Sequence, residues 1–358
     1  MVEGNNHLLM MLVWLAELTF SSWLLSYGAE HLSFKYGAKF VGRTLLSIAT
    51  TLPEIAIVVY AALKGSYGVA IGSGLGSNLL MMTLGLSVML LIATTRLSKF
   101  PLKSIDISAF KMDKIFLIIT AIVSAVVFID GYNYIDGIIF TGMFAVYIGI
   151  AFFEMIRSKS QNNLVKTGSN ESKSVDISSK EPDANIPNDT AFQPVAISGN
   201  KMVKAIIAFL LGTIGIVIGA EPFIEALEGF SADIQISAIV LAVIISPIAG
   251  EMPEKISLML LARKGAHGAS IAIANVLGSK ILNNTLLLAV AVFGAMIHGG
   301  FYSYIEPTPL LLQQIVLVTT VTLLSVALIS RKTIGLRTGI ILASMYVVSI
   351  GIQFALVQ

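Results

Sequence analysis

The segment ATTLPEIAIVVYAALKG at residues 49–65 recurs without a gap as AGEMPEKISLMLLARKG at residues 249–265. Each copy places a proline directly before a glutamate within an apolar stretch, at residues 53–54 and 253–254. Similarity in Leu, Ile and Ala arises readily by chance between apolar helices, but a shared Pro-Glu pair does not. These two segments therefore indicate an internal repeat.

A second pair of segments supports the repeat. Residues 76–86, GSNLLMMTLGL, align with residues 278–288, GSKILNNTLLL, and share six of eleven positions. The offset between the copies changes from 200 to 202, so the second copy has two more residues between its segments. With five membrane spans in each half, equivalent points are an odd number of crossings apart, and the copies cross the membrane in opposite directions. Inverted repeats of this kind are typical of secondary transporters with alternating access.

The composition excludes a water-soluble fold. Of 358 residues, 56% are hydrophobic and 12% are charged, and the mean hydropathy is +0.86, far above the balance of a soluble domain. Charged residues delimit the apolar segments, because a charge at the bilayer centre costs about 2.5 to 3.5 kcal/mol. The predicted spans are 8–28, 37–63, 68–95, 112–130, 137–157, 202–223, 232–262, 268–295, 309–330 and 334–357. The sequence thus predicts an all-α integral membrane protein whose ten transmembrane helices form a 5+5 inverted-topology repeat.

The connecting segments differ in charge and length. Basic residues gather after the odd-numbered spans, whereas the segments after the even-numbered spans hold one lysine and seven acidic residues. By the positive-inside rule, both termini lie outside and the odd connections are cytoplasmic, in a multi-pass protein of the cell membrane. Residues 158–200 are rich in Ser, Asn, Lys and Asp, which predicts a disordered cytoplasmic linker between the halves 1–157 and 201–358. This linker serves as a tether, with a regulatory role as the alternative.

Four carboxylates fall within the predicted spans, at Glu17, Glu54, Glu251 and Glu254. An acid inside the membrane is a functional candidate by default, because an unpaired one loses several kcal/mol of solvation. Glu54 and Glu254 are equivalent in the repeat and are expected to meet near the midplane. Glu17 has no counterpart in the second half, which favours a structural role for it.

The residues around the two equivalent glutamates supply only oxygen ligands. Pro53 and Pro253 free backbone carbonyls, since proline removes a helical hydrogen bond. Hydroxyl groups are supplied by Thr50, Thr51, Ser77 and Ser279. Ca2+ takes six to eight oxygen ligands in flexible geometry, and the sequence has no Cys and no convergent set of His for a softer metal. We therefore expect a hard divalent cation at Glu54 and Glu254.

These motifs resemble the cation/Ca2+ exchanger superfamily, and most closely its Na+/Ca2+ exchanger branch. The resemblance rests on Leu-Pro-Glu at 52–54, Met-Pro-Glu at 252–254 and Gly-Ser at 76–77 and 278–279. It implies ten helices, a central site between helices 2, 3, 7 and 8, and countertransport of Ca2+ against Na+ or H+. It also implies Glu54 as a principal ligand with Glu254, supported by the neighbouring hydroxyl groups.

The chain departs from the pattern of this superfamily at several positions. Members usually have Asn or Asp four residues after the Gly-Ser serine, where this chain has Met81 and Asn283. Glu251 replaces a hydroxyl residue, and Lys280 stands where the first copy has Asn78. The candidate ligands are accordingly Glu54, Glu254, Glu251, Thr50, Thr51, Ser77, Asn78, Ser279 and Asn283.

Two interpretations of Lys280 remain open at the level of sequence. Its ammonium can occupy the acidic site as a tethered cation; with three glutamates and one lysine the site then carries a charge of −2, which suits a divalent ion. Alternatively, Lys280 and Lys255 extend to the membrane surface or pair elsewhere. A cluster of carboxylates can also hold protons, so H+ is an alternative counter-ion.

The sequence predicts a secondary antiporter that exchanges Ca2+ or a similar divalent cation for Na+. An H+-coupled exchanger is the first alternative and a cation channel the second. The expected partners are Ca2+, Na+ or H+ and the lipid bilayer, without nucleic acid and without a resident cofactor. An enzyme is not expected, because the sequence has no His-Glu-x-x-His motif, cysteine or nucleophile elbow.

Overall fold

The structure is a computed structural model that describes residues 4–33, 47–168 and 199–355. These residues are mostly helical. The long helices are α1 (Gly4–Ser33), α3 (Ser47–Leu63), α4 (Tyr67–Leu80), α5 (Leu86–Thr94), α6 (Lys111–Val127), α7 (Tyr134–Gly168), α8 (Gly199–Ile234), α9 (Ala238–Ala262), α10 (Ala266–Leu282), α11 (Leu288–Gly299), α12 (Pro309–Ile329) and α13 (Leu336–Ala355). The π-helical segments η2 (Met81–Gly85) and η5 (Asn283–Leu287) join α4 to α5 and α10 to α11. Two 3-10 segments are η3 (Ser108–Phe110) and η4 (Phe128–Asp130).

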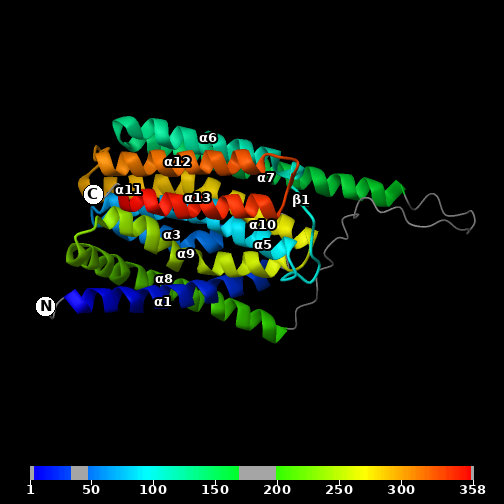
Figure 1. The fold of residues 1–358 in the computed structure, drawn as a ribbon, viewed down its shortest axis with the longest axis horizontal. Coiled ribbons are helices and arrows are strands. Elements are labelled where there is room, and N and C mark those ends of the chain that lie inside the picture. Colours follow the sequence, from blue (N-terminus) through cyan, green and yellow to red (C-terminus); the bar gives the residue numbers. More distant parts are fainter. Residues whose placement is uncertain (1–3, 34–46, 169–198, 356–358) are drawn as a thin grey trace, which may run out of the picture.

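The helices lie along a common direction in one bundle (Figure 1). Eight helical stretches in the described part of the chain are long and apolar enough to cross a membrane. The helices α3 and α9 add shorter apolar stretches, Thr50–Leu63 and Ala238–Met252. The prediction of a helical, multi-pass membrane protein is therefore confirmed. Both marked ends of the chain lie at the same end of the bundle, and α7 projects beyond the opposite end (Figure 1).

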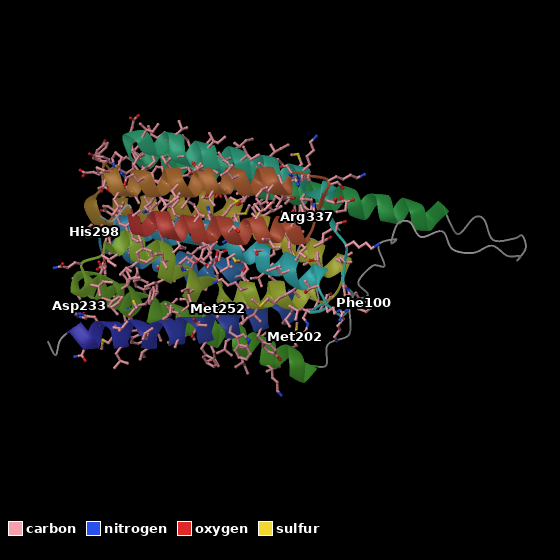
Figure 2. The ribbon with its side chains drawn as sticks, in the orientation of Figure 1. Phe100, Met202, Asp233, Met252, His298 and Arg337 are labelled. Carbon is pink, nitrogen blue, oxygen red and sulfur yellow. The ribbon has the colours of Figure 1, made fainter. Side chains whose placement is uncertain are left out.

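Polar or charged residues lie at both ends of the bundle. Figure 2 shows Asp233 and His298 near one end, and Phe100 and Arg337 towards the other. Met252, which lies between Glu251 and the Pro-Glu pair of α9, is at an intermediate depth (Figure 2). The acidic segment of α9 therefore lies in the interior of the bundle, far from both ends.

Several helix ends differ from the predicted spans. The helix α8 continues through Pro222 to Ile234, whereas the predicted span ended at 223. The last turns of α8 carry exposed or half-buried acidic residues. The predicted span ended near the first of these charges, because a charge was taken to mark the end of an apolar segment. The chain reverses at Gln235, which has a φ of 56°. The next helix begins after Ser237, whose hydroxyl oxygen accepts a hydrogen bond from the Ile239 backbone N–H at 3.3 Å.

The predicted linker is helical at both of its described edges. The helix α7 runs on to Gly168 and α8 begins at Gly199, whereas disorder was predicted from 158 to 200. Residues 169–198 lie outside the described part of the chain.

Short strands tie the connections at each end of the bundle. The strand β1 (Ile105–Asp106) pairs antiparallel with β2 (Thr333–Ile334). At another place Tyr132 pairs with Ile305, through backbone N–H···O distances of 3.1 and 2.8 Å. Each pairing joins a connection of the first half to one of the second half, which holds the halves in one unit.

A close approach of α4 and α9 brings repeat segments of the two halves together. A Cβ atom on Gly76 would lie 2.0 Å from the backbone oxygen of Val243, so only glycine fits there. This contact places the next residue of α4, Ser77, against the helix that carries Glu251. The packing of small residues thus positions polar groups from both halves beside one another.

Candidate functional site

Three glutamates lie buried in the interior of the bundle. Glu54 is on α3, directly after Pro53, and Glu251 and Glu254 are one turn apart on α9. Their side chains are 2%, 0% and 1% exposed, respectively. Such burial of ionisable groups needs partners within the protein, because neither water nor lipid can stabilise them there.

Glu254 is held by side chains of α10. Its Oε1 atom accepts hydrogen bonds from Ser279 Oγ at 2.9 Å and from Asn275 Nδ2 at 3.1 Å. Ser279 was a predicted site residue, whereas Asn275 was not. Asn275 precedes Ser279 by four residues and so shares its helix face; that spacing was the signal available in the sequence.

Glu54 packs against the backbone of α9. A Cβ atom on Gly250 would lie 2.9 Å from Glu54 Cδ, so the glycine leaves room for this carboxyl group. Gly250 directly precedes Glu251, so the Glu54 carboxyl group lies beside the turn of α9 that carries the other two acids. Among the described residues Glu54 Oε2 has no hydrogen-bond partner, although it is buried. One oxygen of this glutamate is therefore available for a cation.

Glu251 has a different environment, dominated by Lys280. The Lys280 ammonium forms an ion pair with Glu251 Oε1 and donates a hydrogen bond to Ser77 Oγ at 2.6 Å. Ser77 in turn donates to Glu251. The amide of Asn283 lies 2.6 Å from Ser77 Oγ. The Lys280 side chain thus points inward, toward Glu251 and Ser77, and away from the membrane surface.

The remaining predicted ligands occupy the edges of this site. Thr50 and Thr51 are buried on α3, one turn before Glu54. Asn78 donates to Asn284 Oδ1, and Asn284 Nδ2 lies 3.5 Å from Thr120 Oγ1 of α6. The sequence did not single out Asn284, because its neighbour Asn283 matched the motif and nothing in the pattern showed which amide faces α4.

Two other charged residues within the predicted spans, Lys255 and Glu17, form hydrogen bonds with groups other than these three carboxylates. Lys255 Nζ donates to the backbone oxygen of Pro247 at 3.2 Å. Glu17 accepts a hydrogen bond from Ser21 at 2.7 Å and packs against Gly215 and Gly219 of α8. The other oxygen of Glu17, Oε2, is buried without a hydrogen-bond partner among the described residues.

The donor set of the site is built from carboxylate, hydroxyl and amide oxygens. Within the described ranges, no group of three or more His, Cys, Asp or Glu side chains converges on a single point for a metal ion. The ion pair with Lys280 occupies Glu251, whereas Glu54 and Glu254 have no ion pair among the described contacts. Carboxylate and hydroxyl oxygens are the ligands that hard cations prefer.

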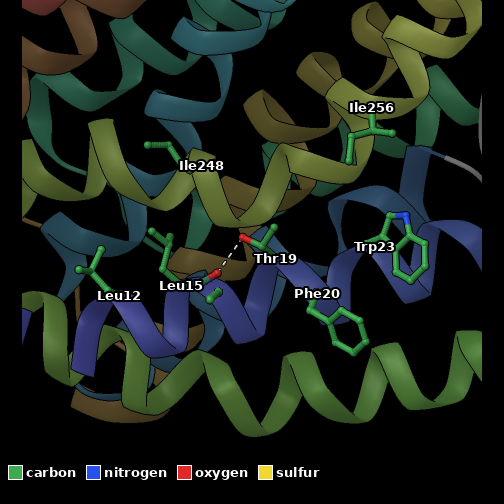
Figure 3. A pocket seen from close by; sticks show the side chains of 8 residues that line it. Leu12, Leu15, Thr19, Phe20, Trp23, Ile248 and Ile256 are labelled. Carbon is green, nitrogen blue, oxygen red and sulfur yellow. Dashed lines mark hydrogen bonds between the residues drawn. The ribbon is translucent and has the colours of Figure 1, made fainter. Parts of the chain in front are cut away.

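A groove between α1 and α9 flanks the site from the lipid side (Figure 3). It has a volume of about 410 Å³. The lining residues are Leu12, Leu15, Ala16, Thr19, Phe20, Trp23, Ile248 and Ile256. The hydroxyl of Thr19 is bonded to the backbone oxygen of Leu15 at 2.7 Å (Figure 3), so the groove presents an almost wholly apolar surface beside the acidic turn of α9.

Ion pairs fasten α8 at the end of the bundle that contains Asp233. Lys64, directly after α3, pairs with Glu225 and with Glu221, the latter at 3.2 Å. Ser66 donates a hydrogen bond to Glu228. The hydrogen bond with Glu225 raises the pKa of Lys64 above its usual value, so the ammonium stays charged through the neutral range. These contacts join α8 to the turn between α3 and α4.

Comparisons with known proteins identify relatives of this chain. Over 332 residues the chain is 24% identical to an uncharacterized membrane protein of Methanocaldococcus jannaschii, with 92% of both chains covered. Over 98 residues it is 33% identical to the sodium/calcium exchanger NCL2 of Oryza sativa subsp. japonica, covering 27% of this chain and 17% of the relative.

Solved structures share the fold at low sequence identity. The H+/Ca2+ exchanger CAX matches with a TM-score of 0.74 at 17% identity, covering 98% of this chain and 84% of that one. The sodium-calcium exchanger NCX_Mj matches with a TM-score of 0.60 at 22% identity, covering 98% and 99%. The family model described as sodium/calcium exchanger protein matches residues 6–153 and 204–355. Because this match includes most of the chain and both copies of the Pro-Glu segment, the chain belongs to the sodium/calcium exchanger protein family.

Proposed function

We propose that this chain is a secondary antiporter that exchanges Ca2+, or a similar divalent cation, for Na+ by alternating access at Glu54 and Glu254. The observation that carries the proposal is the burial of these two acids, with Glu54 packed against the turn of α9 that carries Glu254 and with an oxygen of Glu54 that has no partner among the described residues. A divalent cation supplies the positive charge that such a pair requires in the membrane interior. The supporting oxygens are those of Thr50, Thr51 and Ser279.

The proposal includes ten membrane-spanning helices in a 5+5 inverted repeat, with α3 and α9 as the two spans whose apolar stretches are shorter. The two π-helical segments support it, because η2 begins at residue 81 and η5 at residue 283, the 202-residue offset of the second repeat segment. Gly65 and Gly265 support it as well, since each follows a repeat helix and both have a φ of 81°. Glycine accepts this conformation without the strain of a side chain.

The strand pairings follow the same relation. Ile105 pairs with Ile334, and Tyr132 pairs with Ile305. An offset of 200 takes residue 105 to 305, and one of 202 takes residue 132 to 334. Each pairing is therefore the repeat image of the other, which is the relation expected of halves 1–157 and 201–358 that cross the membrane in opposite directions.

The proposed orientation places both termini outside and the segment containing residues 158–200 in the cytoplasm. The distribution of Lys and Arg supports this, as does the position of Arg337 at the end of the bundle opposite to Asp233 (Figure 2). The contacts of Lys64 with α8 would then lie on the outer side and hold the outer entrance closed.

In the proposed mechanism, α1 and α8 move together past the helices that hold the site. These two helices pack side by side along most of their length (Figure 1). The apolar groove beside α1 offers a smooth surface along which this pair can shift. A cation bound by both acids removes their repulsion and allows the shift, so the site crosses only when it is occupied by the divalent ion or by its counter-ions.

Proton coupling is the second candidate. The observation that favours it is the fold similarity to the H+/Ca2+ exchanger CAX, whose TM-score exceeds that of NCX_Mj. Protons would replace Na+ on the same two carboxylates, and Ca2+ would displace them.

Flux into proteoliposomes tests the proposal and separates the two counter-ions. Vesicles loaded with Na+ and diluted into Na+-free medium should accumulate radioactive 45Ca2+ if the exchange uses Na+. Vesicles with an acidic interior should do so if it uses protons. Uptake that depends on neither gradient, and follows only the Ca2+ gradient, would indicate a channel and contradict the proposal.

A further inference from the structure

We propose that the Lys280 ammonium is a built-in cation that permanently occupies the place of one monovalent ion in the transport site. This inference rests on the proposed function. It concerns the corner formed by Glu251, Ser77 and Asn283, which the exchange of ions between Glu54 and Glu254 does not use. Its consequence is a coupling ratio one monovalent cation lower than the same site would have without the lysine.

The position of the ammonium supports this role. Lys280 is 1% exposed and its partner Glu251 is 0% exposed, so neither group is in contact with the ends of the bundle. Lys280 Nζ makes an ion pair with Glu251 Oε1 and lies 2.6 Å from Ser77 Oγ. A lysine that merely reached for the membrane surface would carry its nitrogen away from these groups.

The three oxygens around the ammonium are the kind that hold Na+. Glu251 supplies a carboxylate and Ser77 a hydroxyl. With its amide oxygen turned toward this corner, Asn283 supplies a third oxygen at 3.3 Å from Lys280 Nζ. An ammonium has three N–H donors, one for each of these acceptors. The lysine therefore fills a small oxygen cage with its own positive charge.

The neighbouring residue shows that this corner is separate from the divalent site. Ser279 precedes Lys280 on α10, but its hydroxyl bonds Glu254 rather than Glu251. Consecutive positions on a helix point about 100° apart, so the two side chains serve different acids. The divalent ion and the ammonium can therefore be bound at the same time.

The charge of the site agrees with simultaneous binding. Glu251 and Lys280 cancel each other, which leaves the two charges of Glu54 and Glu254 for one divalent or two monovalent cations. Because Lys280 is covalently attached, it crosses with the site in both directions and is never exchanged. Without it, Glu251 would be a third carboxylate for the divalent ion, and the three glutamates would need three monovalent cations instead of two on the return step.

The test uses the full-length protein with Lys280→Ala, which empties the cage and leaves its oxygens in place. Lys255→Met is the matched control, since it removes an intramembrane ammonium that bonds only a backbone oxygen among the described contacts. The first measurement is the membrane potential at which net 45Ca2+ flux stops, under known gradients of the counter-ion that drives the wild type. This potential gives the number of monovalent cations per Ca2+.

We expect that number to rise by one in Lys280→Ala and to stay unchanged in Lys255→Met. Adding Glu251→Gln to Lys280→Ala should restore the wild-type ratio, because it removes the unbalanced carboxylate. Transport by Lys280→Ala at the wild-type ratio would overturn the proposal. Failure of the wild type to exchange ions at all would overturn the proposed function instead.

A second measurement keeps the inference testable if Lys280→Ala does not transport. Equilibrium binding of radioactive 22Na+ to the purified, folded protein should show one more bound Na+ per molecule in Lys280→Ala than in the wild type. The double variant with Glu251→Gln should lose this extra ion. An equal number of bound Na+ in all three proteins would contradict the assignment of Lys280 as a built-in cation.

Discussion

Ser279 and Lys280 are consecutive residues of α10 that bind different glutamates: Ser279 Oγ donates to Glu254 Oε1 at 2.9 Å, whereas Lys280 Nζ pairs with Glu251. The three buried acids of the site are thereby divided. Glu251 has a cation supplied by the protein, and Glu54 and Glu254 are left to a cation from solution. The following expected outcomes depend on this division.

Removing the charge of either repeat-related acid should stop exchange. Glu54→Gln and Glu254→Gln each delete one anionic ligand, and loss of one partner of a buried charge pair costs about 3 to 5 kcal/mol. At 1.4 kcal/mol per tenfold, exchange should fall by about 100-fold or more in vesicle flux assays. Glu306→Gln, at an exposed acid, is the control and should transport as the wild type does. Full activity of either site variant would remove that residue from the ligands.

Weakening the support of Glu254 should lower the affinity for Ca2+ without abolishing exchange. Ser279→Ala removes a hydrogen bond to a charged oxygen, which is worth about 1.5 to 3 kcal/mol. We expect the concentration of Ca2+ that half-saturates uptake to rise by about tenfold. Ser344→Ala, an exposed serine bonded only to its own helix backbone among the described contacts, should leave it unchanged. An unchanged half-saturation in Ser279→Ala would show that this hydroxyl does not position the carboxylate.

The ion pairs of Lys64 should influence opening at the end of the bundle where Asp233 lies. Lys64→Met removes the contacts with Glu221 and Glu225, which are half-exposed or exposed and together worth about 1 kcal/mol at most. The expected result is up to a fivefold faster reaction of a single cysteine introduced near this entrance with a water-soluble maleimide. The chain has no native cysteine, so the label reports only the introduced one. A slower reaction would contradict a closing role for the pair.

The sign of the pH response of this contact follows from the raised pKa of Lys64. A lysine whose pKa is raised by its partner stabilises the folded contact below its unperturbed pKa, and the contribution is lost as the pH rises through the raised value. Labelling of the introduced cysteine, corrected for thiol ionisation with a free thiol standard, should therefore be constant through neutral pH. An increase between pH 6 and about 8 would show that another group controls this entrance.

Filling the apolar groove should lower the rate of exchange while leaving equilibrium Ca2+ binding almost unchanged. Ala16→Trp places a large ring between α1 and α9, where the proposed movement of α1 requires space (Figure 3). We expect the maximal rate of exchange to fall about tenfold or more while equilibrium Ca2+ binding changes less than twofold, since overpacking costs about 1 to 3 kcal/mol. Val347→Trp, on an exposed face of α13, is the control. An unaltered rate in Ala16→Trp would mean that the groove does not take part in the movement.

The Pro-Glu repeat was the feature of the sequence that singled out the two acids of the candidate site, and the structure buries both. A shared proline and glutamate in two apolar segments located Glu54 and Glu254, because acids are rare and costly inside the membrane. The Gly-Ser motifs singled out Ser77 and Ser279, because this motif also recurs at equivalent positions in the two halves. The helical, multi-pass fold followed from hydropathy alone.

Contacts between helices could not be predicted in the same way. The pairing of Lys280 with Glu251 depends on how α4, α9 and α10 cross, and the close approach at Gly76 that fixes this crossing involves a backbone atom of Val243. Asn284 was missed for a related reason, because two adjacent amides point in different directions on a helix. Helix ends were misplaced where a helix continues past its apolar segment, as at Pro222, because hydropathy marks the membrane boundary rather than the end of hydrogen bonding.

The most direct test of the central claim is a crystal structure of the protein grown with Ca2+ and measured for the anomalous signal of that ion. The account predicts one Ca2+ peak in the interior of the bundle, within about 2.3 to 2.6 Å of carboxylate oxygens from both Glu54 and Glu254, with Lys280 still bound to Glu251. A Ca2+ ion bound at another place, with these two carboxylates occupied by no cation, would contradict the account.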